Sequence, residues 1–191
     1  MIAIRWYVML FPTSRDPLPL MQELAALTGG TAVAEPHVTI GMFDAADEHV
    51  DLAAPLRGLT GPPVTIRAGG PYNDLAADPG SAGHALLLRV ARTPALAWWY
   101  RAIRATLRPL APPVWVTWEL ARPHLYGVER TARPFGEVSA LLAGRTWEVE
   151  FGATTLLVSQ RLGGRYVARL EQPLTGGAGH VSAMDPERVR E

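Results

Sequence analysis

One pattern occurs twice in the sequence, and it limits the fold more than any other feature. It reads EPHVTIG at residues 35–41 and RPHLYG at residues 122–127, so that a proline, a histidine, an apolar residue and a hydroxyl side chain, Thr39 or Tyr126, follow one another. Side chains alternate across a β-strand, so His37 and Thr39 would share one face while the apolar residues beside them share the other. The pattern predicts two strands that each bury one face and present an imidazole and a hydroxyl on the other.

Apolar spacing and Gly/Pro breaks predict a chain of mixed strands and helices. Strands are expected at residues 2–11, 37–43, 64–66, 85–90, 114–128, 147–159 (one long or two short) and 165–170, and helices at 17–28, 47–59, 94–107 and 134–142. Residues 69–83 are expected to form a loop, and residues 175–191 a flexible tail after a single domain at residues 1–174. The order helix, strand, helix, strand, strand surrounds both histidines, which predicts a degenerate internal duplication.

Composition removes several classes of chemistry. The 191 residues include no cysteine and no lysine, which excludes disulfides, thiolate nucleophiles, cysteine-ligated zinc and lysine adducts. The formal net charge is zero, so a nucleotide site would have to be local. Residues 2–11 lack the flanks of a signal peptide, and no apolar run approaches the ~20 residues that span a bilayer. We expect a cytoplasmic monomer with no membrane partner.

Two strands related by a pseudo-twofold axis would place His37 and His124 across one groove. The unperturbed pKa of histidine is about 6.5, so one ring can act as general base and the other as general acid near neutral pH. The hydroxyls of Thr39 and Tyr126 would hold phosphoryl oxygens and stabilise the charge that grows there. This arrangement requires no metal, and no cofactor is expected. No acidic cluster accompanies either histidine, which argues against a two-metal phosphodiesterase. The remaining histidines are interpreted as surface residues.

These motifs resemble those of the 2H phosphoesterase superfamily, named for two His-x-Thr/Ser motifs, and within it the 2′-5′ RNA ligase and cyclic phosphodiesterase group. HVT at residues 37–39 matches the first motif, whereas the second matches at His124 and departs at Tyr126. LVSQRL at residues 157–162, with the Gly turn and strand that follow, is similar to the C-terminal hairpin of the family. The resemblance implies an α+β fold with two pseudo-symmetric antiparallel-sheet lobes, outer helices and a central groove.

The resemblance also implies metal-independent hydrolysis or transfer at 2′,3′-cyclic or 2′-5′ phosphodiesters of nucleotides or RNA ends. Carried over by residue, His37 and His124 become the acid/base pair, and Thr39 and Tyr126 become phosphate ligands. The phenol oxygen of Tyr126 lies farther from the backbone than a threonine hydroxyl would. Two alternatives stay open: a catalytically weakened module that binds nucleotide or RNA in the same groove, and an enzyme for non-nucleotide phosphodiesters.

Two further residues are candidates for substrate contacts. Arg161 would pair with phosphate and Tyr7 would stack on a base. A solvated hairpin arginine and a half-buried strand tyrosine are the alternative interpretations. In the run WWY at residues 98–100, adjacent helical side chains point in different directions, so at least one is expected to fill the core.

Overall fold

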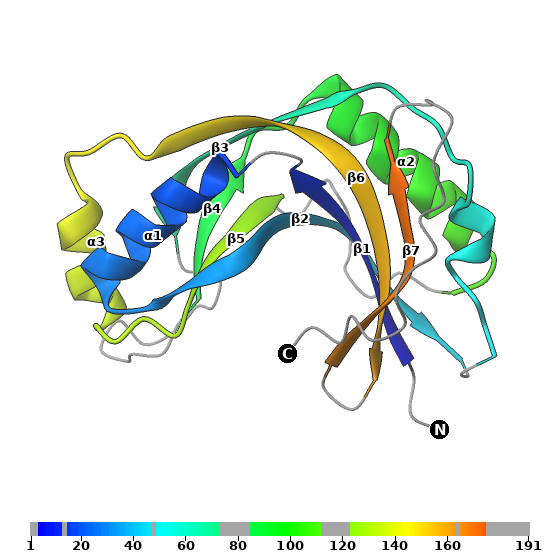
Figure 1. Cartoon of the computed structure of the whole chain (residues 1–191), viewed down its shortest axis with the longest axis horizontal. Helices are drawn as coiled ribbons and strands as arrows, with labels where there is room; N and C mark the ends of the chain where they lie inside the picture. Colours follow the sequence, from blue (N-terminus) through cyan, green and yellow to red (C-terminus); the bar gives the residue numbers. More distant parts are fainter. Residues whose placement is uncertain are drawn as a thin grey trace.

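The computed structural model describes residues 4–12, 15–46, 49–72, 85–111, 123–162 and 165–174, which form a mixed α and β chain (Figure 1). The strands are β1 (Ile4–Pro12), β2 (Thr31–Ala45), β3 (Val64–Tyr72), β4 (Leu86–Val90), β5 (His124–Glu129), β6 (Glu148–Leu162) and β7 (Arg165–Pro173). The helices are α1 (Pro17–Thr28), α2 (Pro94–Leu107) and α3 (Phe135–Leu142), with a 3-10 turn η1 (Ala54–Leu56). The predicted element order therefore recurs from α1 and from α2, with η1 in place of one helix.

The strands form a seven-stranded antiparallel sheet in the order β1-β2-β5-β4-β3-β6-β7, and β1 also pairs with β6. The first residues of β6 pair with β3, and its later residues pair with β1 and β7. Likewise, β2 pairs with β5 near its start and with β1 from Val38 onward. The two long strands thus belong to both halves of the sheet, of which one contains β3, β4 and β5 and the other contains β1 and β7. In Figure 1 they run between the end that carries α1 and α3 and the end that carries α2.

Local signals at their ends explain why α1 and α2 have the predicted bounds. Pro17 begins α1, where its missing N–H needs no partner, and Gly29 ends it with a left-handed φ of 67°. At the start of α2, the Thr93 hydroxyl accepts a hydrogen bond from the backbone N–H of Leu96. Both helix predictions are confirmed.

The helix predicted at residues 47–59 is wrong, and η1 is the helical element described there. The Asp51 carboxylate accepts hydrogen bonds from two backbone N–H groups that follow it, which favours a turn, and Pro55 cannot donate within a helix. Gln172 of β7 donates to the carbonyl of Leu56 at 3.0 Å. A tertiary contact therefore helps to hold the segment.

The third strand is longer than predicted, because residues 69–72 belong to it and are not a loop. The register against β4 shifts between Gly69 and Pro71, and the intervening Gly70 has a left-handed φ of 57°. An extra residue of this kind bends the strand without ending it. Three predictions fall on segments outside the described residues. They are the rest of the expected loop at residues 73–83, the start of the strand predicted at residues 114–128, and the expected tail at residues 175–191.

The two faces of the sheet differ. Residues of all three helices pack against one face and form the main core, which includes Val38, Leu88 and Leu125. Trp99 of α2 is fully buried there and donates its Nε1–H to the carbonyl of Pro62 at 2.8 Å, which confirms that the aromatic run supplies a core residue. The described residues contain no helix long and apolar enough to cross a membrane.

Candidate functional site

His37 and Tyr126 lie opposite each other on neighbouring strands. They are partners in the antiparallel register of β2 and β5, and the next pair is Val38 with Leu125. Val38 and Leu125 are fully buried in the main core, so alternation directs His37 and Tyr126 to the other face of the sheet. We call this the site face, defined by His37 and Tyr126. The sequence predicted this division for β2.

Aromatic rings flank His37 on the site face. The centroid of its ring lies 5.3 Å from that of Phe11, with an angle of 25° between the ring planes. It lies 6.1 Å from the centroid of Tyr126, with an interplanar angle of 16°. Phe11 comes from β1 and Tyr126 from β5, the strands on either side of β2. The two stacks restrict the plane of the imidazole.

A backbone hydrogen bond orients the same ring. The Nδ1 atom of His37 lies 3.0 Å from the carbonyl oxygen of Glu35. A carbonyl only accepts, so this hydrogen bond requires the proton on Nδ1. In the neutral ring Nε2 is then the basic nitrogen, and Nε2 is the atom that can take up or release a proton.

His124 lies beside this pair. It precedes Tyr126 by two residues on β5, is 9% exposed, and alternates with the core residue Leu125, which directs it to the site face. Because Tyr126 is the register partner of His37, His124 is its diagonal neighbour. Diagonal neighbours in an antiparallel pair lie about 7–8 Å apart, close enough for both rings to reach one phosphoryl group between them.

Thr39 follows Val38 on β2 and is half-buried between the buried core residues Val38 and Ile40. Alternation therefore directs it to the site face with His37. Thr39 and His124 are the residues that come next after the paired Val38 and Leu125 on their respective strands. The arrangement thus has a local twofold character: a histidine stands beside a hydroxyl residue on each of two antiparallel strands.

The hydroxyl of Tyr126 holds its proton more tightly than an ordinary tyrosine. Partial burial raises the pKa of the phenol above 10, and the nearby carboxylate of Glu129 raises it further. Tyr126 is therefore neutral at pH 7 and can donate a hydrogen bond from its O–H.

Arg89 adds a cation to this region, and the predictions from sequence missed it. It is the register partner of His124 in the pairing of β4 with β5, and it alternates with the core residues Leu88 and Val90. Its guanidinium carbon lies 4.9 Å from the ring centroid of Tyr72. One charged residue within the apolar run LLLRV was the signal that could have revealed it.

The two remaining candidates lie in the half of the sheet that does not contain β5. Tyr7 of β1 is 8% exposed and packs with Met9 and Leu157, and its ring meets that of Tyr166 edge to face at 5.0 Å. Tyr166 is 42% exposed and offers more aromatic surface than Tyr7. The backbone of Arg161 on β6 pairs with that of Tyr166 on β7. The roles of Tyr7 and Arg161 in substrate binding stay predictions.

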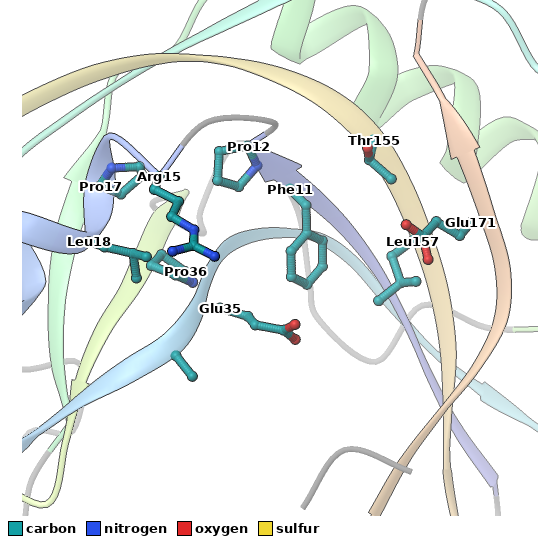
Figure 2. A pocket seen from close by; sticks show the side chains of 11 residues that line it. Phe11, Pro12, Arg15, Pro17, Leu18, Glu35, Pro36, Thr155, Leu157 and Glu171 are labelled. Carbon is teal, nitrogen blue, oxygen red and sulfur yellow. The ribbon is translucent and has the colours of Figure 1, made fainter. Parts of the chain in front are cut away.

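Figure 2 shows the residues that line a cavity of about 330 Å³, two of which, Phe11 and Glu35, contact His37. Its lining includes Phe11, which stacks on His37, and Glu35 and Pro36, which immediately precede His37. Arg15 enters from the segment before α1, and Glu171 comes from β7. Within the described ranges, no three His, Cys, Asp or Glu side chains are grouped so that they could hold a metal ion.

No protein-family model matches the sequence. A search of curated proteins likewise found no match.

Solved structures do share the fold. The Thermus thermophilus protein TT0787 superposes with a TM-score of 0.61 at 16% identity, covering 90% of this chain and 98% of that one. Escherichia coli LigT complexed with 3′-AMP gives a TM-score of 0.60 at 14% identity, with 91% and 99% covered. Kluyveromyces marxianus Usb1 with uridine monophosphate gives 0.54 at 10% identity, with 90% and 97% covered.

Proposed function

We propose that this chain, whose fold is the 2H phosphoesterase-like α+β fold that its motifs predicted, is a metal-independent phosphodiesterase. It would hydrolyse 2′,3′-cyclic or 2′-5′ phosphodiester bonds of nucleotides or RNA ends. The observation that carries the proposal is the diagonal placement of His37 and His124 on adjacent strands of one sheet face. Bound nucleotides in two structures with the same fold, 3′-AMP in LigT and uridine monophosphate in Usb1, support this class of substrate.

In the proposed reaction one neutral imidazole takes a proton from water as its oxygen attacks the phosphorus atom. The bond from phosphorus to the 2′ or 3′ oxygen breaks, and the second histidine, as imidazolium, donates its proton to that leaving oxygen. The hydrogen bond from Nδ1 of His37 to the Glu35 carbonyl keeps Nε2 as the atom that transfers the proton in either role. After one turnover the histidine that began neutral carries a proton, and the histidine that began as imidazolium is neutral. Proton exchange with solvent restores both starting states.

Charge that grows on the phosphoryl oxygens needs donors in place of water. Thr39 and Tyr126 would supply neutral O–H donors, and the raised pKa of Tyr126 keeps its donor protonated. Arg89, next to His124 across the β4–β5 pair, would supply positive charge. This assignment gives the chain one cationic and two neutral contacts for a dianionic transition state.

The first test is hydrolysis of 2′,3′-cyclic nucleotides and 2′-5′ linked dinucleotides in excess chelator. His37→Ala and His124→Ala should each lower kcat by about 10²–10⁴-fold or more, since each removes a proton-transfer group. His49→Ala is the matched control, because His49 is exposed and lies outside β2 and β5. Chelator-sensitive turnover, or normal turnover in both histidine variants, would overturn the proposed mechanism.

A second candidate is a nucleotide- or RNA-binding module with little turnover. The stacking of Tyr126 on His37 favours it, because the larger side chain occupies space beside the imidazole that a threonine would leave open. Tyr126→Thr separates the two functions. A large gain in hydrolysis would support the binding module, whereas a loss would mean that the tyrosine suits the natural substrate. Saturable nucleotide binding by the unaltered chain without turnover would also support the module.

A further inference from the structure

The cavity beside His37 is lined by aromatic, apolar and charged side chains. At about 330 Å³ it lies at the lower end of the range typical for small-molecule sites, roughly 300–1,000 Å³. Its wall combines an aromatic ring from Phe11 with apolar contacts from Pro36 and Leu157. Three exposed charged side chains also line it, namely Arg15, Glu35 and Glu171.

The cavity shares a wall with the proposed active site. Phe11 lines the cavity and also stacks on His37, and the backbone of Glu35 accepts the hydrogen bond from Nδ1 of that histidine. A nucleoside whose phosphate lies at His37 and His124 would therefore have its base within reach of the cavity. Figure 2 shows the Arg15 guanidinium on one side of the Phe11 ring and Glu171 on the other, with the Glu35 carboxylate below the ring.

The polar groups of the lining have complementary hydrogen-bonding characters. Carboxylates are acceptors only, and a guanidinium is a donor only. A flat ligand that engages both oxygens of one carboxylate and also the guanidinium presents two adjacent donors on one edge and acceptors on another, and its ring can stack on an aromatic side chain.

Among the four bases of RNA, guanine alone has this arrangement. Its N1–H and N2–H₂ groups are neighbouring donors that one carboxylate can accept together, and its O6 and N7 atoms are acceptors for arginine. In adenine and cytosine the amino group stands next to a ring nitrogen that accepts, so a second carboxylate oxygen would be repelled. In uracil the only ring donor lies between two carbonyl oxygens.

We propose that this cavity is a guanine-binding subsite, in which Glu35 or Glu171 accepts from N1–H and N2–H₂, Arg15 donates to O6 or N7, and Phe11 contacts the base. The inference rests on the proposed function, because it assumes that the scissile phosphate lies between His37 and His124. It gives the chain a preference for substrates whose nucleoside at the reacting phosphate is guanosine.

The test compares kcat/KM for the 2′,3′-cyclic phosphates of guanosine, adenosine, cytidine and uridine. The unaltered chain should favour the guanosine substrate over the adenosine one by about 5–150-fold, the range expected for one well-placed bidentate contact. Glu35→Gln or Glu171→Gln, whichever supplies the contact, should reduce that ratio to near one. A far-ultraviolet circular dichroism spectrum equal to that of the unaltered chain shows that the variant is folded.

Glu137→Gln is the matched control, because Glu137 is an exposed glutamate on α3 and does not line the cavity. It should keep the full guanosine preference. Equal kcat/KM for all four substrates, or a preference that survives both Glu35→Gln and Glu171→Gln, would overturn the guanine subsite and leave the phosphodiesterase proposal standing. Hydrolysis of none of the four, nor of 2′-5′ dinucleotides, would instead contradict the proposed function.

Discussion

Tyr126 replaces the second motif's expected threonine or serine, and the structure gives this replacement a physical meaning. Its ring stacks on that of His37, and burial together with Glu129 raises the pKa of its hydroxyl. One residue thus both restricts the imidazole and offers a hydrogen-bond donor. A threonine on the same strand would offer a donor without the stack.

The raised pKa leads to a prediction for alkaline solution. An ultraviolet titration should find a tyrosine whose pKa lies above the ordinary value, and this ionisation should be absent from Tyr126→Phe. Since the folded-state pKa lies above the unfolded value, the stabilising contribution of this group is complete below about pH 10 and is lost as the pH rises through the folded-state pKa. Denaturant unfolding at a series of pH values should therefore show a weaker alkaline loss of stability in Tyr126→Phe. An equal loss in both proteins would contradict the assignment.

Arg89 carries a second prediction at the scale of single residues. If its guanidinium contacts the substrate phosphate, Arg89→Gln should lower kcat/KM by about 10–150-fold, the loss expected for a hydrogen bond to a charged group. Arg89→Lys should recover only part of this, because lysine keeps the charge but not the planar fork that stacks on Tyr72.

Steady-state kinetics on one cyclic nucleotide tests this, with Arg57→Gln as the control for a lost surface charge. Arg57 is exposed and follows η1, outside the strands that carry the histidines. Unchanged kinetics in Arg89→Gln would remove Arg89 from the site.

At the scale of elements, the junction between α1 and β2 is packed tightly against β5. A methyl group added at Gly30 would lie 2.6 Å from Cγ1 of Val128 and 2.9 Å from the carbonyl oxygen of Glu129. Because one of these atoms belongs to the backbone, relief would require the strand that bears His124 to move. The glycine therefore allows the helix-to-strand turn to approach β5 closely.

We predict that Gly30→Ala lowers the free energy of unfolding by about 1–3 kcal/mol, the usual cost of overpacking. Gly152→Ala is the matched comparison, since an added methyl group there would meet no atom within 4 Å. That variant should be neutral or slightly more stable, because alanine reduces the freedom of the unfolded chain. Chemical denaturation measures both changes, and equal stability of the two variants would contradict the packing argument.

In the molecule as a whole, β2 and β6 join the two halves of the sheet. Each strand pairs with members of both halves, and residues of all three helices contribute to one main core. Neither half can separate without breaking the hydrogen bonds of these strands. We therefore propose that residues 1–174 form a single domain, as expected from the sequence. Unfolding experiments can test this proposal.

We expect one cooperative transition in denaturant. Tryptophan fluorescence and far-ultraviolet circular dichroism should give the same midpoint, because Trp6 of β1 and Trp99 of α2 are buried in the same core. Two transitions, or midpoints that differ between the probes, would show that the halves unfold separately.

The elements whose signals are local could be predicted from the amino-acid sequence alone. Pro17 and Gly29 set the ends of α1, Thr93 the start of α2, and the alternation around His37 assigned each side chain of that strand to a face. The two histidine motifs then led to the 2H phosphoesterase-like fold, which the likeness to solved structures confirms. The predictions for α1, α2 and the faces of β2 succeeded because each depends on residues within a few positions of one another.

Features that depend on pairing between distant segments became visible only in the folded chain. The η1 turn contacts Gln172, which lies far along the chain, and the extension of β3 relies on its pairing with β4 and β6. The stack of Phe11, His37 and Tyr126 depends on the register of β1, β2 and β5, and the position of Arg89 beside His124 depends on the register of β4 and β5. The cavity beside His37 brings β1 and β2 together with β6, β7 and the start of α1. Register is a long-range property, since it is fixed by the complete pattern of buried faces and turns and not by any one stretch of sequence.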